Sequence, residues 1–209
     1  MRLFSALLLA GAISAGACYG QYTAAPSGEP PSQLAGPVRD AMQKQGTKIT
    51  GSGTTIEVWF RAKAPAGAQS AEPDVTLTAI PQGALVGALR ITGKYTDRRG
   101  TTILPGVYTL RYSDYPVNGE HQGVAPQRDF LLMVPAANDS DPGATPGFDA
   151  LVAMSKKASG TPHPAVLSCY KSDSGDKPGL AKAGENDWVL TGKMGDTMIS
   201  LTVVGTATS

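Results

Sequence analysis

An alternating run of side chains and a second, largely apolar run, separated by a loop that Gly and Pro interrupt, constrain the fold of this chain more than any other feature. The first run is 104–112, which begins with the turn pair Pro105-Gly106, and the second is 128–134. Period-two alternation is typical of a strand with one buried face. The loop between the runs, 114–127, is polar and longer than the roughly 2–5 residues of an ordinary hairpin loop. These features predict an antiparallel β protein that displays this loop.

The rest of the chain repeats the same kinds of pattern. Turn residues separate short alternating runs, and two stretches have apolar side chains at helical spacing. The predicted strands are 47–50, 54–61, 75–80, 85–92, 165–171, 187–193 and 197–204, and the predicted helices are 32–45 and 147–158. We therefore expect a mainly β fold: a single antiparallel β-sandwich, Ig-like or jelly-roll-like, with two short helices.

The first 17 residues have the features of a signal peptide. Met1-Arg2 is a short basic start, 3–15 is an apolar run too short to span a bilayer, and Ala-Gly-Ala at 15–17 is a small-residue cleavage pattern. We expect an exported protein, periplasmic or extracellular. The expected organisation is a signal peptide at 1–17, a flexible leader at 18–31 and one β-sandwich domain at 32–209, with no later transmembrane segment.

Cys18 directly follows the predicted cleavage point, and three alternatives remain open for it. Lipidation would tether the protein to a membrane. Retention without lipid would allow a disulfide with Cys169, because export favours oxidation. Removal with the signal would leave Cys169 as a lone, buried thiol.

The balance of charge limits the classes of partner. The chain has 18 Lys and Arg residues against 17 Asp and Glu, and loss of Arg2 with the signal peptide makes these numbers equal. This balance argues against nucleic acid as a partner. The partner is unknown; Tyr112 and Tyr115 beside Arg111 and Arg128 would suit a glycan or a peptide, and packing is an equal alternative for these side chains. No cofactor is predicted, because the glycines lie at turns rather than between a strand and a helix.

The polar residues in and around the long loop are the candidate binding site. His121 and His163 are the two histidines of the chain, and both lie in loops bounded by Pro or Gly. Arg128 could hold the loop through a carboxylate, because a guanidinium pairs with carboxylates in a planar geometry. The full candidate set is Asp114, Tyr115, Glu120, His121, Arg128, Asp129 and His163. The leading interpretation is an exported binding or structural module with a recognition loop at 114–127.

The alternative is a metal-binding or hydrolytic exported enzyme that uses His121 and His163. A zinc site would need further ligands from Asp114, Glu120, Asp129 or Cys169, and methionines would be needed for copper. No serine lies in a Gly-x-Ser-x-Gly pattern. The oxygen-rich stretch 138–143 lacks the ligand series of a calcium loop and predicts an ordinary turn. The sequence therefore assigns no catalytic residue and no firm metal ligand.

Several phrases resemble a family of uncharacterised exported bacterial proteins. The residues that carry the resemblance are the Pro-Gly-x-Tyr-x-Leu phrase at 105–110, Glu57-Val-Trp-Phe-Arg61, the stretch 119–130, the stretch 158–165 and Asp187-Trp-Val-Leu190. The resemblance covers nearly the whole mature chain. It implies export and a single domain, and it lends no activity and no catalytic residue.

Overall fold

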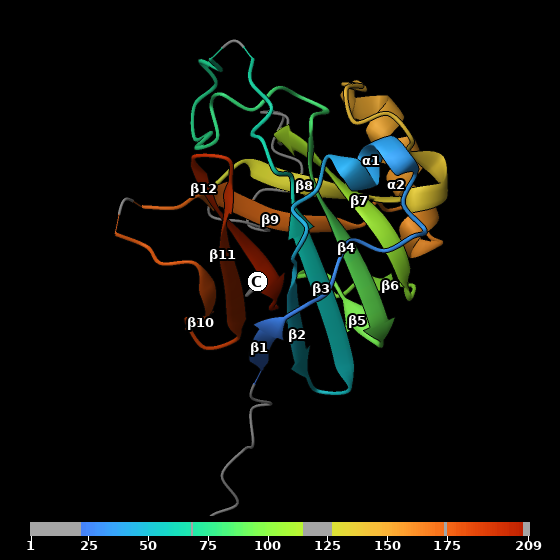
Figure 1. Cartoon of the computed structure of the whole chain (residues 1–209), viewed down its shortest axis with the longest axis vertical. Coiled ribbons are helices and arrows are strands. Elements are labelled where there is room, and N and C mark those ends of the chain that lie inside the picture. Colours follow the sequence, from blue (N-terminus) through green and yellow to red (C-terminus); the bar gives the residue numbers. More distant parts are fainter. Residues whose placement is uncertain (1–21, 68, 115–126, 174, 207–209) are drawn as a thin grey trace, which may run out of the picture.

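A computed structural model describes residues 22–67, 69–114, 127–173 and 175–206. Within these ranges, ten strands form one antiparallel sheet in the order β1-β2-β3-β4-β7-β8-β9-β12-β11-β10, and β5 pairs with β6 in a separate hairpin (Figure 1). The strands are β1 Thr23–Pro26, β2 Thr47–Gly51, β3 Thr54–Phe60, β4 Leu85–Gly93, β5 Tyr95–Thr96, β6 Thr102–Ile103, β7 Gly106–Asp114, β8 Asp129–Pro135, β9 Val166–Lys171, β10 Gly179–Ala183, β11 Asp187–Met194 and β12 Thr197–Val204. The helices are α1 Gly36–Asp40, the 3-10 turn η1 Ala136–Asn138 and α2 Phe148–Ser159.

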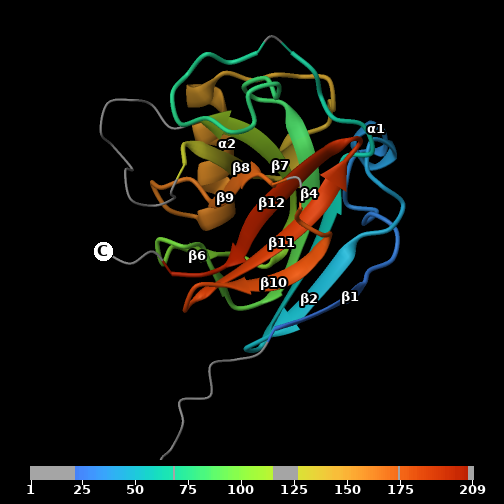
Figure 2. The same cartoon turned by 90° about the vertical axis from the view of Figure 1, so that its left-hand side faces the viewer.

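The sheet curls until its two edge strands, β1 and β10, approach each other, so the fold is a nearly closed barrel (Figure 2). The expected two-sheet sandwich, Ig-like or jelly-roll-like, is therefore wrong. Alternation indicates that a strand has one buried face, which is equally true in a sandwich and in a barrel. The difference is made by the pairing of β8 with β9 and of β9 with β12, which joins all the strands into one sheet.

Apolar side chains fill the barrel. Every second residue of the central strands points inward, and Ile56, Leu89, Leu110 and Leu131 are members of one buried cluster. The same cluster includes Leu77 and other residues of the segment 62–84, which we call the cap segment. The interior is therefore a packed core rather than a ligand cavity, and one end of it is covered by the cap segment (Figure 1).

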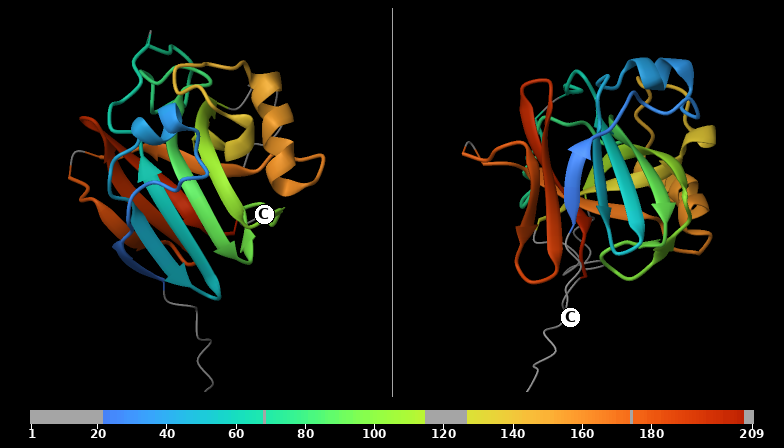
Figure 3. Two further views of the ribbon diagram at one scale, coloured as in Figure 1. Left: turned by 45° about the vertical axis from the view of Figure 1, so that its right-hand side comes forward. Right: turned by 60° about the horizontal axis from the view of Figure 1, so that its bottom comes forward.

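The two helices pack on the outer face of the sheet (Figure 3). Val38 of α1 contacts the cluster that contains Trp59 and Leu85, whose side chains point away from the barrel interior. Leu151 of α2 packs in the same way on the outer face of β8. Because β8 is buried on both faces, its residues 130–134 are all apolar, as is typical of a strand covered on both sides.

Most predicted elements are confirmed, and two need correction. The predicted helix 32–45 is wrong in length: α1 has five residues, since the chain beyond it turns to pair Met42 with Arg61 in an isolated bridge. The predicted strand 75–80 lies in the cap segment and forms no strand. The structure adds β1, which lies within the predicted leader 18–31, the two-residue strands β5 and β6, and β10, none of which was predicted.

Helices of the described ranges are short, α2 being the longest at 12 residues, and none of them has the length and apolar character that a bilayer crossing requires.

Candidate functional site

Three of the predicted site residues lie together at the capped end of the barrel. Asp114 ends β7, Asp129 begins β8, and these two residues are directly paired in the sheet. Arg128 precedes Asp129. Tyr115, Glu120 and His121 lie outside the described residues, as does most of the loop 114–127. What the structure describes of this site is therefore the pair of strand ends that the loop connects.

Asp129 is fully buried and accepts four hydrogen bonds. Its carboxylate accepts bonds from the Thr76 backbone N–H (2.7 Å), the Thr76 hydroxyl (2.8 Å), the Leu77 backbone N–H (3.0 Å) and the Tyr112 hydroxyl (2.7 Å). Burial and the nearby Asp129 carboxylate raise the pKa of Tyr112 well above its ordinary value, so the phenol stays neutral and donates. Asp129 therefore holds the cap segment on the barrel and has no lone pair turned toward a ligand.

Arg128 pairs with carboxylates, as the sequence predicted. One of them, Asp114, lies at the start of the loop, and the other, Glu72, lies in the cap segment. Nη2 of Arg128 lies 3.5 Å from Asp114, and Nη1 lies 2.8 Å from Glu72. The Glu72 side chain is half exposed, so the second pair is screened by solvent and contributes little to stability. The Arg128–Asp114 pair ties the two ends of the loop together.

His163 lies far from these residues along the sheet. It follows α2, in a turn where its backbone N–H donates to the Thr161 hydroxyl and its carbonyl accepts from Ser159. The carbonyl of Ala165, two residues further along, accepts from the Met133 N–H. Met133 lies four positions along β8 from Asp129, a distance of about 14 Å at ~3.4 Å per residue. The main chain of His163, rather than its imidazole, makes these contacts. The four predicted site residues that the structure describes thus fall into two groups, Asp114, Arg128 and Asp129 at the start of β8 and His163 near its end.

The described residues supply no geometry that favours the metal or hydrolase alternative. No group of three His, Cys, Asp or Glu side chains in these ranges could hold a metal ion. Cys169 is a free, buried thiol on β9, and burial together with the nearby Asp129 charge raises its pKa. A thiol held neutral in this way is a poor nucleophile and a poor ligand.

A cavity lies at the end of the barrel opposite the cap segment, which we call the open end. It has a volume of about 670 Å³. In an antiparallel sheet the start of one strand lies beside the end of its neighbour, so Thr54 of β3, Lys94 after β4, Asn186 before β11 and Val204 of β12 all lie at this end. Five separate segments of the chain meet around this pocket.

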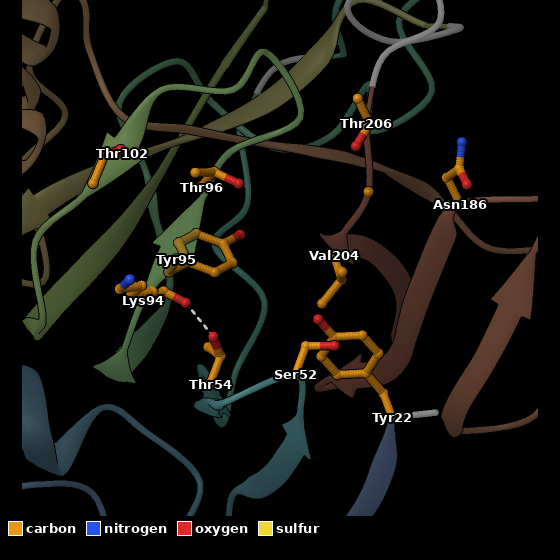
Figure 4. Close-up of a pocket in the computed structure, with 11 residues that line it drawn as sticks. Tyr22, Ser52, Thr54, Lys94, Tyr95, Thr96, Thr102, Asn186, Val204 and Thr206 are labelled. Atoms are coloured by element: carbon orange, nitrogen blue, oxygen red, sulfur yellow. Dashed lines mark hydrogen bonds between the residues drawn. The ribbon is translucent and has the colours of Figure 1, made fainter. Parts of the chain in front are cut away.

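Two tyrosines form part of the pocket wall. Figure 4 shows Tyr22 and Val204 on one side and Tyr95 across from them. The Tyr95 hydroxyl donates to the Val203 carbonyl (3.0 Å), and burial, with Asp97 and Tyr22 nearby, raises its pKa well above the ordinary value. The Tyr22 ring contacts the Trp188 ring, and the two ring centroids lie 5.6 Å apart. Both rings are thus fixed in place without a ligand.

The remaining lining is rich in groups that both donate and accept hydrogen bonds. The Thr54 hydroxyl is occupied by the Lys94 carbonyl (Figure 4). Within the described ranges, the pocket-lining side chains with a hydroxyl or amide group and no hydrogen-bond partner are Tyr22, Ser52, Thr96, Thr102, Asn186 and Thr206. Lys94 is the one charged residue among the described lining residues. The pocket therefore presents free hydroxyl and amide groups, two aromatic rings and a single cation.

The sequence analysis missed these lining residues. In the connector 93–100, which carries Lys94, Tyr95 and Thr96 of the pocket lining, Arg98 pairs with Asp187 (2.7 Å) and Arg99 pairs with the buried Asp97 (2.8 Å). Single Ser, Thr and Asn residues beside turns have no distinctive spacing, because turns favour these residue types for local reasons. Only the pairing of distant strands brings them together.

Comparisons with known proteins do not place the chain in a family. No family model, no curated protein and no solved structure matches it. The resemblance to uncharacterised exported bacterial proteins therefore stays a prediction.

Proposed function

We propose that this protein is an exported binding module, and that its ligand is a hydroxyl-rich molecule of the glycan class held in the pocket at the open end. The observation that supports this most is the cavity of about 670 Å³ lined by hydroxyl side chains and two tyrosine rings. Pockets of this size, with a few polar groups set among aromatic walls, are typical of ligand sites.

The chemistry of the lining favours a sugar over an apolar ligand. A hydroxyl can donate one hydrogen bond and accept two, so Ser52, Thr96 and Thr206 complement the hydroxyls of a sugar ring. Tyrosine offers an apolar face with a polar tip, which suits the C–H face of the same ring. Lys94 would favour a glycan that carries a carboxylate.

This proposal keeps the binding module expected from the sequence and moves its site from the loop 114–127 to the open end. Arg128 and Asp129, which directly follow the loop, bind the cap segment. The open-end pocket instead has polar groups that are without partners in the described ranges. Export and a periplasmic or extracellular location remain part of the proposal, since a glycan ligand is consistent with them.

The test is calorimetric titration of the mature protein with uronic-acid oligosaccharides and with neutral oligosaccharides of the same length. Lys94→Gln removes the positive charge and Asn186→Ala removes a hydrogen-bonding group, so each should weaken binding about tenfold or more, a factor of ten being about 1.4 kcal/mol. Lys193→Gln and Asn138→Ala are matched controls at exposed positions outside the pocket, and they should leave binding unchanged.

Equal affinity in all four variants would refute the pocket as the site. Absence of binding for both kinds of oligosaccharide would refute the glycan class. Tighter binding of the neutral oligosaccharide would contradict the part assigned to Lys94.

A further inference from the structure

Arg61 lines a second, smaller cavity on the outer face of the barrel. The cavity has a volume of about 210 Å³ and lies between the cap segment and the loop that follows η1. Its walls are mainly Pro and Ala residues: Pro65, Ala66, Pro81 and Ala84 on one side, and Pro142 and Ala144 on the other. It is therefore a cleft with Pro and Ala side chains in its walls and one guanidinium.

Part of this guanidinium is held by the protein and part is free. Nη1 of Arg61 donates to the carbonyls of Leu85 (3.4 Å) and Pro142 (3.2 Å). Nε and Nη2 have no partner among the described residues. The buried side-chain atoms without a partner in these ranges are Gln82 Nε2 and Ser168 Oγ, so the free nitrogens of Arg61 are reached by solvent.

The neighbouring Arg111 of β7 has a guanidinium whose hydrogen-bond donors are all satisfied, mainly by the loop that follows η1. Arg111 is fully buried, and its N–H groups donate to both oxygens of Asp139 and to the carbonyls of Gly83, Asp141 and Ala144. These acceptors use all five N–H donors of the side chain. Asp139, the buried carboxylate of the loop, is therefore already committed to Arg111 and does not neutralise Arg61.

Among the described residues, no carboxylate forms an ion pair with Arg61. The Asp141 carboxylate accepts from the Gly143 backbone N–H (2.8 Å) and forms no ion pair with Arg61 in the described ranges. Burial and the nearby positive charge of Arg111 lower the pKa of Arg61. A negative group beside Arg61 would relieve this repulsion.

We propose that the cleft at Arg61 is a binding site for a small carboxylate, which pairs in bidentate fashion with Nε and Nη2. The planar fork of a guanidinium matches the two oxygens of a carboxylate. The Pro and Ala walls suit a short apolar body better than a hydrated tetrahedral anion. A volume of about 210 Å³ corresponds to about seven water molecules at ~30 Å³ each, which limits the ligand to a few heavy atoms. This site is separate from the pocket at the open end.

The test is an NMR titration of the full mature protein with propionate, using propionamide as a neutral probe of the same shape. Propionate should shift the backbone amides of Gly143 and Ala144 in a saturable way, and propionamide should not. Arg61→Gln should weaken propionate binding at least tenfold, while Arg61→Lys keeps a weaker response because it retains the charge and loses the fork. Arg39→Gln, at an exposed arginine of α1, is the matched control.

A second variant guards against a folding defect in Arg61→Gln. Ala66 lies on the exposed part of the cap segment, so Ala66→Trp should fill the cleft while leaving Arg61 in place. It should also abolish the propionate response. An unchanged response in both variants would overturn the proposal, and tighter binding of inorganic phosphate than of propionate would overturn the choice of a carboxylate.

Discussion

Individual charged residues in this protein are buried only where other side chains or backbone groups compensate them. Glu57 shows the pattern on the outer face of β3: Oε1 accepts from the Ser27 hydroxyl (2.6 Å), and Oε2 accepts from Arg90 Nε (2.5 Å). Arg90 in turn lies over the Trp59 ring, 5.6 Å from its centroid. Such a group stabilises the fold only while it is charged.

The first prediction concerns Glu57 and pH. Burial would raise the pKa of Glu57, but the hydrogen bonds from Arg90 and Ser27 outweigh it, so the pKa lies below the ordinary value of 4.5. Because the folded-state pKa is the lower one, the stabilisation is present above about pH 4.5 and is lost as the pH falls through the folded-state value. Glu57→Gln should lower the free energy of unfolding by about 1–2 kcal/mol near neutral pH. The effect stays small because the Arg90 side chain is 38% exposed, so solvent screens its ion pair with Glu57.

Urea unfolding at a series of pH values measures this effect. The wild-type and Glu57→Gln curves of stability against pH should converge in acid, because the wild-type carboxyl is then also neutral. Glu185→Gln, at an exposed position, should run parallel to wild type throughout. Parallel curves for Glu57→Gln as well would show that the hydrogen bonds to Glu57 do not depend on its charge.

At the scale of elements, the cap segment shows how one side chain overrides a local pattern. Residues 75–80 alternate as a strand does, yet the backbone N–H groups of Thr76 and Leu77 donate to the Asp129 carboxylate instead of to a neighbouring strand. A carboxylate that accepts several N–H and O–H groups competes well with a sheet ladder, because charge-assisted hydrogen bonds are the stronger ones. The cap segment thus has its shape dictated by a residue 52 positions from Leu77.

The second prediction is that Asp129→Asn releases the cap segment. An amide places an NH₂ group where the carboxylate accepted bonds, so at least one buried donor loses its partner, at a cost of about 2–4 kcal/mol. Hydrogen exchange at the Thr76 and Leu77 amides should become faster, and faster than at β7 or β8 amides. Asp40→Asn on the exposed end of α1 is the control. Equal acceleration along the whole chain would indicate global destabilisation rather than release of the cap segment.

At the scale of the whole molecule, closure of the barrel depends on strands that are far apart in the sheet order. Phe60 of β3 and Gly192 of β11 meet across the interior, and a Cβ at Gly192 would overlap the Phe60 ring. Gly192 therefore allows the two arms of the sheet to approach. Tyr22 and Trp188 make a further contact between the two arms, beside the strands β1 and β11.

The third prediction is that Gly192→Ala destabilises the barrel by about 1–3 kcal/mol, the usual cost of added volume in a packed core. The melting temperature should fall, and the near-ultraviolet circular dichroism of the aromatic residues should change. Gly36→Ala at the start of α1 adds a methyl group with no atom within 4 Å, so it should be neutral or slightly stabilising. A neutral Gly192→Ala would mean that the two arms of the sheet are not held against each other at this point.

The sequence by itself determined the mainly β character, most strand positions and the helix Phe148–Ser159, because alternation and helical spacing are local consequences of which face is buried. It also predicted that Arg128 pairs with a carboxylate near the loop, and Asp114 is one such partner. The tertiary structure alone decided between sandwich and barrel, since hydrogen bonds between distant strands such as β9 and β12 leave no mark on neighbouring residues. It alone also brought Tyr22, Ser52, Lys94 and Asn186 to one pocket. Their separation in the chain means that no spacing could have shown it.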